Sequence, residues 1–421
     1  MEFEAFRPAE LAAYLKRIPV VSALLGDGEL NVAEVGDGNL NYVYFVGNAA
    51  APQRGVVVKQ APPFLRLVGD AWPLRRERME REVAALRRFG ALCPQHVPQV
   101  YHADGGLYLM VMQRLASHRV LRGGLIDGVV YPRLAEHMAA YLARTLFFGS
   151  DLYLAPDKKK ESVAADINSE LCKITEDLVF TYPFIDHPSN VYNPALPAAA
   201  IARLREHAPL RVAAAQMKWA FMNRAETLVH GDLHTGSIMV NETETYVIDP
   251  EFAFYGPMGF DIGALLANLL LAYYAQDWHE RQRGRDPHAY QRWLLDQVER
   301  VWSGFAEQFT GLWRQHERDR GGAFIGGAAD APAAAAFRQR FMQRLFADAL
   351  GFAGCKMIRR IVGMAKVADI TGITDDATRA RIEVRCLRLA EALLVRRDDF
   401  ASIDEVVELA AKVHAQPEAD A

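Results

Sequence analysis

Two acidic motifs stand close together in the second half of the chain, His230-Gly-Asp-Leu-His-Thr-Gly-Ser-Ile-Met-Val240 and Val247-Ile-Asp-Pro-Glu-Phe252. Each lies beside short β-rich runs, so their carboxylates are expected in loops at strand ends. Asp249 comes 17 residues after Asp232, and Glu251 follows two positions later. Phosphoryl transfer needs one carboxylate to orient and deprotonate a hydroxyl, and others to hold the Mg²⁺ that neutralises a triphosphate. The spacing therefore favours this chemistry, with both loops in one cleft.

Competing interpretations of the first motif are weaker. His230 and His234 have the spacing of a zinc helix, but Gly231 and Gly236 interrupt the segment, which also lacks the glutamate of HExxH. The run Thr235-Gly-Ser-Ile238 does not have the G-x-S-x-G pattern of a serine hydrolase. A purely structural turn remains as the other alternative.

The segment Gly36-Asp-Gly-Asn-Leu-Asn41 lies between two β-rich runs, 31–35 and 42–46. A dinucleotide-binding loop would be followed by a helix, whereas a strand follows here. That context suits a hairpin whose backbone amides close over phosphates, as in the glycine-rich loop of kinases. Taken alone, however, the segment favours a plain β-turn built on Asp-Gly.

Lys59 ends the apolar strand that begins at Val56, and it is either a charge at a strand end or a phosphate ligand. A helix is expected over 74–89, opened by Pro73. Glu82 falls on the apolar stripe of that helix, among Met79, Val83 and Leu86. Because an unpaired buried carboxylate is costly, we expect Glu82 to pair with Lys59.

The order of predicted elements indicates an α+β protein with two lobes. Residues 1–114 are expected to form a β-rich, nucleotide-binding lobe with a small antiparallel sheet and one helix, and residues 115–421 a helical catalytic and substrate-binding lobe. Strands are expected at 31–35, 42–46, 56–59 and 107–112, and then at 227–230, 238–240 and 246–249. Helices are expected at 134–148, 171–180, 199–222, 261–275, 291–313, 337–366 and 378–397.

Composition sets broad limits on the function. The 421 residues include 48 Lys and Arg against 52 Asp and Glu, so the basic excess of a general nucleic-acid binder is missing. The four cysteines form no CxxC pair, as expected of free thiols in a reducing cytoplasm. The N-terminus has no secretory signal pattern, and the apolar run 263–275 is too short to span a bilayer.

These motifs resemble the aminoglycoside-phosphotransferase and choline-kinase branch of the protein-kinase-like fold, whose signature is HGDLHxxN followed by IDxE. Within that branch the chain is most similar to the 5-methylthioribose kinases. Four segments carry the similarity: HGDLHTGSIMV at 230–240, DPEFAFYGPMGFDIG at 249–263, VVKQAPPFLRLVGDAWPL at 57–74, and GFAGCKMIRRIVGMAKVAD at 351–369.

The resemblance implies a set of nucleotide ligands. Asn39 or Asn41 would cover the phosphates, Lys59 held by Glu82 would contact them, and the main chain of 113–115 would bind adenine. Ser237 replaces the asparagine that binds metal in most kinases, so Asp249 and Glu251 would carry the Mg²⁺. The implied ATP-binding residues are Asn39, Asn41, Lys59, Glu82, Gln113, Arg114, Leu115, Asp249, Pro250 and Glu251.

On the acceptor side, the resemblance implies that Asp232 takes the proton from the substrate hydroxyl. It places Trp72, in a loop over 69–74, near the phosphates, and it brings Arg359 and Arg360 to the site from a C-terminal helix. The buried face of that helix is expected to hold Ile358, Ile361, Val362 and Ala365. Adjacent residues diverge by about 100°, so only one of the two arginines is expected to point at the substrate, and the sequence does not decide which. A surface arginine capping another helix is the alternative.

The expected activity is transfer of the γ-phosphate of ATP to the anomeric hydroxyl of 5-methylthioribose, with Mg²⁺ as cofactor. The alternatives are kinases of another small alcohol, such as choline, homoserine or an aminoglycoside, and a catalytically inactive nucleotide-binding scaffold. Asp261 is expected to cap a helix or brace a loop. The resemblance implies ATP and a small molecule as partners, without nucleic acid or membrane, and a homodimer.

Overall fold

The computed structural model describes residues 3–35, 40–66, 69–317 and 331–416. The chain forms two compact units, which are described separately. The first comprises Met1–His118 and returns in Tyr246–Ala253, and the second comprises Arg119–Thr245 and Phe254–Ala421. The segment that contains Asp249 and Glu251 therefore belongs to the same unit as Lys59 and Glu82.

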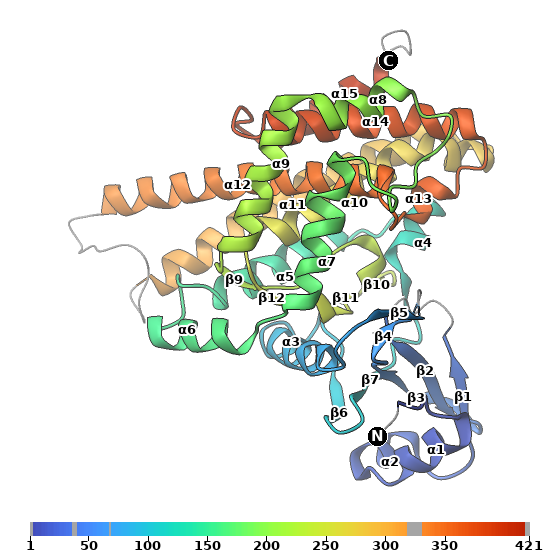
Figure 1. The fold of residues 1–421 in the computed structure, drawn as a ribbon. Coiled ribbons are helices and arrows are strands. Elements are labelled where there is room, and N and C mark those ends of the chain that lie inside the picture. The colour runs from blue at the N-terminus through green and yellow to red at the C-terminus, as the bar shows by residue number, and fades with distance from the viewer. Residues whose placement is uncertain (1–2, 36–39, 67–68, 318–330, 417–421) are drawn as a thin grey trace. The chain divides into compact units, whose positions relative to one another are not determined.

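The first unit is built on a five-stranded antiparallel sheet in the order β1-β2-β3-β7-β6 (Figure 1). Its strands are β1 (Leu30–Glu34), β2 (Tyr42–Asn48), β3 (Ala51–Gln60), β6 (Val100–Asp104) and β7 (Leu109–Gln113). Two helices that the sequence analysis did not predict, α1 (Pro8–Lys16) and α2 (Pro19–Leu25), pack on one face and share an apolar core with Val56 and Val58. Because side chains alternate along a strand, Lys59 points to the opposite face.

Helix α3 (Arg78–Leu92) begins four residues later than its predicted start at 74. Pro73 does not open it, because that proline ends a strand, β5 (Gly69–Pro73), which pairs with β4 (Phe64–Leu65). The segment 69–74, expected as a loop, is therefore mostly extended. The predicted inward stripe is confirmed, since Met79, Glu82, Val83 and Leu86 are all buried.

The second unit is mostly helical. Its helices are α4 (Leu121–Ile126), α5 (Leu134–Phe148), α6 (Pro156–Ala165), α7 (Ser169–Phe180), α8 (Ala198–Glu206), α9 (Ala208–Asn223), α10 (Gly259–Gln282), α11 (Pro287–His316), α12 (Ala331–Val362), α13 (Ala368–Thr371), α14 (Asp376–Val395) and α15 (Ile403–Ala415). Short strands β8 (Arg119–Val120), β9 (Thr227–Val229), β10 (Ile238–Val240) and β12 (Phe254–Gly256) accompany them, and β11 (Thr245–Val247) spans the boundary between the units. The predicted helix over 199–222 is two helices, which meet at His207.

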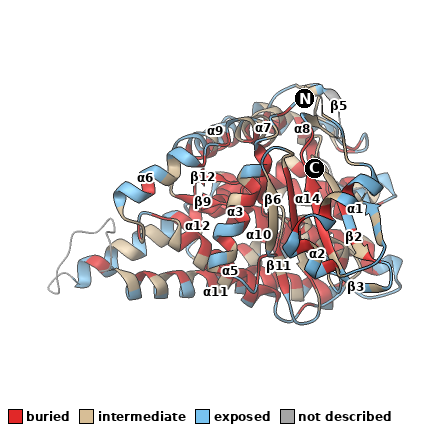
Figure 2. Cartoon of the chain, turned by 90° about the horizontal axis from the view of Figure 1, so that it is seen from below, coloured by how far each residue is buried: buried red, intermediate tan, exposed pale blue. Residues whose placement is uncertain are grey.

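The helices of the second unit differ in how deeply they are buried. Figure 2 shows α6 as largely exposed, and only Lys159 of that helix is buried. In contrast, α10 is buried almost throughout its first eighteen residues, from Gly259 to Gln276. No helix among the described residues has the length and apolar character needed to cross a bilayer.

Helices α10 and α12 approach closely because glycines face the contact. A Cβ atom added to Gly263 would lie 2.4 Å from the carbonyl oxygen of Ala349 and 2.8 Å from the backbone nitrogen of Ala353. Neither backbone atom can move without displacing its helix. The same contact holds the C-terminal half of α12 against the start of α10.

We predict that Gly263→Ala lowers the free energy of unfolding by about 1–3 kcal/mol, the usual cost of overpacking a core. Gly311→Ala on α11 is the control, because a Cβ atom there meets nothing within 4 Å. That substitution should be neutral or stabilising by up to about 1 kcal/mol, since alanine favours helices over glycine. Urea unfolding measures both variants, and equal stabilities would contradict the close contact.

Candidate active site

The predicted pair of Lys59 and Glu82 is present in the first unit. Lys59 Nζ lies 2.5 Å from Glu82 Oε1 and also forms an ion pair with Asp249. The strand β3 supplies the lysine and the inward stripe of α3 supplies the glutamate, whose side chain is fully buried. Burial alone would lower the pKa of Lys59, but the carboxylates of Asp249 and Glu82 outweigh it and raise that pKa. Lys59 is therefore held as a cation.

The second acidic motif forms a tight turn beside this pair. Asp249 adopts a left-handed backbone conformation, with φ 71° and ψ 42°, and a short 3₁₀ helix follows from Pro250 to Phe252. Left-handed geometry is uncommon in residues other than glycine, although aspartate tolerates it better than most. The turn buries Glu251, whose Oε2 accepts a hydrogen bond of 2.8 Å from the side-chain amide of Asn41.

Three carboxylates, two from this turn and one from α3, lie close together and match the donors that a hard divalent cation prefers. One oxygen each of Glu82, Asp249 and Glu251 lies within 4.8 Å of the others. Burial raises the pKa of Glu82 to about 7, and burial together with Asp249 and Glu82 raises the pKa of Glu251 well above its ordinary value. Glu82 Oε2 is buried without a hydrogen-bond partner among the described residues. This crowding of negative charge fits a cation site.

The other predicted site residues of the first unit are the nucleotide ligands Asn39 and 113–115, and Trp72, which was expected on the acceptor side. Gln113 ends β7, where its backbone N–H donates to the carbonyl of Gln99, and Arg114 and Leu115 follow it. The guanidinium of Arg114 lies 5.5 Å from the centre of the Phe45 ring. Trp72 lies half-buried on β5, and Asn39 falls outside the described residues. The roles assigned to these residues stay predictions.

The Asp232 loop in the second unit is held by its own side chains. Gly231 has φ 84°, which favours glycine at this position. The carboxylate of Asp261 accepts hydrogen bonds of 2.6 Å and 3.0 Å from the backbone N–H groups of His230 and Gly231. Asp261 lies in the first turn of α10 rather than at its N-cap, so it braces the loop, as one of the two expectations stated. Ser237 Oγ donates to the carbonyl of Asp232 at 3.1 Å.

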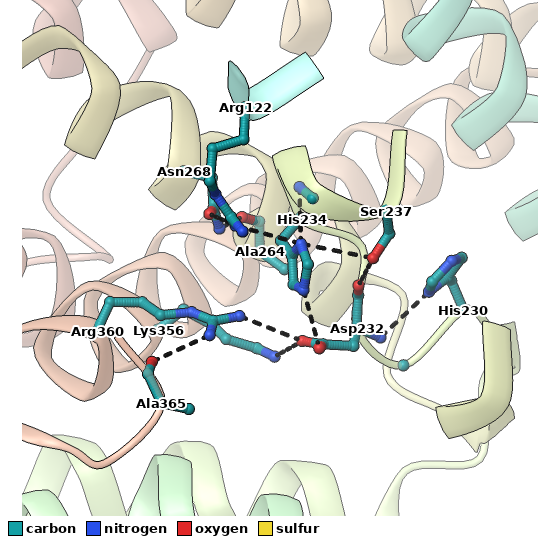
Figure 3. A network of polar contacts seen from close by, with 12 residues as sticks. Arg122, His230, Asp232, His234, Ser237, Ala264, Asn268, Lys356, Arg360 and Ala365 are labelled. Atoms are coloured by element: carbon teal, nitrogen blue, oxygen red, sulfur yellow. Dashed lines mark hydrogen bonds and ion pairs between the residues drawn. The ribbon is translucent and has the colours of Figure 1, made fainter. Parts of the chain in front are cut away.

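Donors meet both carboxylate oxygens of Asp232 (Figure 3). Lys356 Nζ lies 3.0 Å from Oδ1, Arg360 Nη2 lies 3.8 Å from the same atom, and His234 Nε2 lies 3.2 Å from Oδ2. Burial would raise the pKa of Asp232, but Lys356 and His234 outweigh it and hold that pKa well below its usual range. The side chain remains 22% exposed, so the ionised carboxylate is accessible to a further donor.

The tautomer of His234 follows from its neighbours. The backbone N–H of Gly236 donates to Nδ1 at 2.9 Å, and Arg122 Nη2 lies 3.3 Å from the same nitrogen. Two donors at Nδ1 assign the proton to Nε2, which therefore donates to Asp232. Burial lowers the pKa of His234 to about 4, so the ring is neutral near pH 7.

The two predicted arginines differ in their surroundings. Arg360 is buried, lies beside Asp232, and donates through Nη1 to the carbonyl of Ala365 at 3.1 Å. Arg359 has Nε and Nη1 buried without hydrogen-bond partners among the described residues. Ala365 was expected on the buried face, but it lies beyond the helix because α12 ends at Val362. Neither arginine is an exposed helix cap.

Lys356 was missed by the sequence analysis, although it is the cation nearest to Asp232 among the described residues. It precedes Arg359 and Arg360 by three and four positions, so all three share one face of α12. The helical period was applied only to the apolar residues of this helix. Applied to its charged residues, it would have placed Lys356 beside the two arginines. His234, which lies within the quoted motif, was considered only as a zinc ligand.

Comparisons with known proteins show which proteins this chain is similar to. The phosphotransferase enzyme family matches residues 31–305. Methylthioribose kinase 1 of Oryza sativa subsp. japonica is 46% identical over 98% of this chain and 96% of its own length. The methylthioribose kinase of Geobacillus kaustophilus is 41% identical over 91% of both chains. A solved glucosamine kinase, bound to glucosamine, ADP and inorganic phosphate, aligns with 94% of this chain and 88% of its own at 16% identity and a TM-score of 0.47.

The chain thus has a phosphotransferase fold of the protein-kinase-like type, with an antiparallel sheet in one unit and mostly helices in the other. Within the phosphotransferase enzyme family, it belongs to the methylthioribose kinases.

We predict that Lys59→Met destabilises the protein by about 3–5 kcal/mol, because removing one partner leaves the buried Glu82 uncompensated. Urea unfolding measures the loss. Lys158→Met is the control, since Lys158 pairs with Glu161 in an exposed position and should hardly contribute. A Lys59→Met protein as stable as the wild type would contradict a structural role for the ion pair.

Proposed function

We propose that this protein is an ATP-dependent kinase that phosphorylates 5-methylthioribose on its anomeric hydroxyl, giving 5-methylthioribose 1-phosphate and ADP. The observation that carries this proposal is the 46% identity to a methylthioribose kinase over 98% of the chain. The ionised and accessible carboxylate of Asp232 supports it, because alcohol phosphorylation needs a group that orients the hydroxyl and accepts its proton.

We assign the acceptor step to Asp232. The anomeric oxygen forms a bond to the γ-phosphorus of ATP while the bond from that phosphorus to the β,γ-bridging oxygen breaks, and ADP leaves with the electron pair. The hydroxyl proton passes to Asp232 and then to solvent. A phosphoryl transition state asks for little covalent help from the protein, so orientation and electrostatics supply most of the catalysis.

We assign nucleotide binding to the first unit. Lys59, fixed by Glu82, would contact the phosphates, and Asn41 would contribute beside Glu251. Asp249 and Glu251 would hold Mg²⁺, which when bound neutralises charge on the triphosphate. The crowding of their carboxylates supports this assignment, since buried acidic groups that repel one another are suited to binding a cation.

Charge near Asp232 argues against a cationic acceptor. Lys356, Arg359 and Arg360 surround one carboxylate, so the local balance is positive. Choline or an aminoglycoside would meet repulsion there, because like charges at close range disfavour binding. A neutral sugar acceptor, which becomes an anionic phosphate ester, suits this environment better.

We also infer the setting of the reaction. Phosphorylation of methylthioribose is a step of methionine salvage, which takes place in the cytoplasm. The free cysteines Cys93, Cys172, Cys355 and Cys386 are consistent with a reducing compartment. A homodimer is the assembly that the resemblance implies, and size-exclusion chromatography with light scattering would test it.

The substrate assignment is tested by coupled ADP release with methylthioribose, ribose, choline, homoserine and glucosamine as acceptors. We expect the highest kcat/KM with methylthioribose, and phosphorus NMR should show a phosphate ester at the anomeric carbon. Folded, ATP-binding protein that is inactive with methylthioribose would refute the proposal. Preference for choline or glucosamine would do the same.

We predict that Asp232→Asn lowers kcat by about 10²–10⁴-fold, the usual contribution of a general base. The Kd for ATP, measured by calorimetry, should remain close to the wild-type value because Asp232 is assigned to the acceptor. Asp151→Asn is the matched control, since that carboxylate also pairs with a buried lysine, which is Lys159 rather than Lys356. Near-normal turnover in Asp232→Asn would exclude Asp232 as the base.

A further inference from the structure

The lysine at position 356 has surroundings that a structural role does not explain. Its side chain is only 3% exposed, and its ammonium nitrogen lies 3.0 Å from Asp232 Oδ1 and 4.4 Å from the centre of the Phe260 ring. Both the carboxylate and the ring attract a cation. A buried ion pair seldom stabilises a fold more than apolar side chains of equal volume would, so stability alone gives little reason for a lysine here.

The charges around Lys356 are mostly unfavourable to it. Arg359 and Arg360 follow on the same helix, while Asp232 and the Asp261 carboxylate on α10 supply the opposing negative charge. Arg122 of α4 adds a further cation near His234. Burial lowers the pKa of Lys356 to about 8, and Asp232 opposes that shift. Lys356 therefore remains a cation near pH 7 chiefly because Asp232 is ionised beside it.

Lys356 is better placed than its neighbours to hold the carboxylate. Arg360 lies 0.8 Å farther from the same oxygen, at 3.8 Å, and one of its nitrogens already donates to Ala365. His234 occupies the other oxygen at 3.2 Å. With Lys356 on Oδ1 and His234 on Oδ2, rotation of the carboxylate about its Cβ–Cγ bond is restrained at both ends.

We propose that Lys356 is a positioning residue for phosphoryl transfer, whose ammonium group fixes Oδ1 of Asp232 and keeps the carboxylate ionised until it accepts the proton of the acceptor hydroxyl. This inference rests on the proposed function for its kinetic consequences, whereas the contact itself is independent of the substrate. Restraint of the base within about 0.5 Å is what efficient catalysis requires of supporting groups.

The test compares Lys356→Met, Lys356→Arg and a control, Lys159→Met. Lys159 is also a buried lysine of the second unit, bonded to Asp151 and to the carbonyl of Ala225, and it does not contact Asp232. Turnover with methylthioribose and the Kd for ATP would be measured from pH 5 to 10, after circular dichroism has shown that each variant is folded.

We expect Lys356→Met to lower kcat by about 10²–10³-fold, as loss of one preorganised electrostatic partner does, with the Kd for ATP within twofold of wild type. The acidic limb of its pH profile should move to higher pH, because Asp232 loses its nearest cation. The wild-type basic limb, near pH 8, should vanish in Lys356→Met and move upward in Lys356→Arg, which should regain part of the turnover. Lys159→Met should leave both limbs in place.

A folded Lys356→Met protein with unchanged pH limbs and kcat within fivefold of wild type would overturn the inference. If the wild type does not phosphorylate methylthioribose, the function fails but the inference remains testable. The carboxyl ¹³C resonance of Asp232, assigned by its loss in Asp232→Asn, would then be titrated in both proteins. A rise in the Asp232 pKa in Lys356→Met supports the inference, and an unchanged value refutes it.

Discussion

Acceptance of a proton and binding of a cation both depend on one constraint, which is the ionisation of carboxylates that are partly or wholly removed from bulk water. A carboxylate in a poorly solvated place either acquires cations and hydrogen-bond donors or takes up a proton. The two sets of carboxylates in this chain differ in their surroundings. Asp232 is surrounded by donors and stays ionised, whereas burial and the neighbouring carboxylates raise the pKa values of Glu82 and Glu251, which have Lys59 and Asn41 as their respective partners. One arrangement suits accepting a proton, and the other suits receiving a cation.

Much of the first unit was predictable because its signals are local. β-rich runs bounded by Gly, Pro or Asp located the strands around Val56, and the 3.6-residue period placed Glu82 on the inward stripe of its helix. The cost of burying that carboxylate then identified Lys59 as its partner, which the structure confirms. The helix start was placed too early because Pro73 fits both the first turn of a helix and the end of an edge strand.

Other features depended on contacts between distant residues. Helices α1 and α2 are short and were not predicted, and helices of this length depend on packing, here against the sheet, for their stability. His207 divides the predicted helix over 199–222, and Pro209, in the first turn of α9, is a local signal of that break that was overlooked. Lys356 was missed for a different reason, because a charged residue on a helix is usually solvated. Its spacing from Arg359 and Arg360 placed it on their face of the helix, but its partner Asp232 lies 124 residues away in the chain.

The return of residues 246–253 to the first unit has a consequence for how this protein can be divided. The chain passes between the units after His118, after Thr245 and after Ala253, so the first unit is not a continuous piece of sequence. A fragment ending at His118 would carry Lys59 and Glu82 without Asp249 or Glu251. A chimaera that takes one unit from a relative would therefore need a junction at each of these three crossings. Recombination at a single point would separate the acidic turn from the lysine that it contacts.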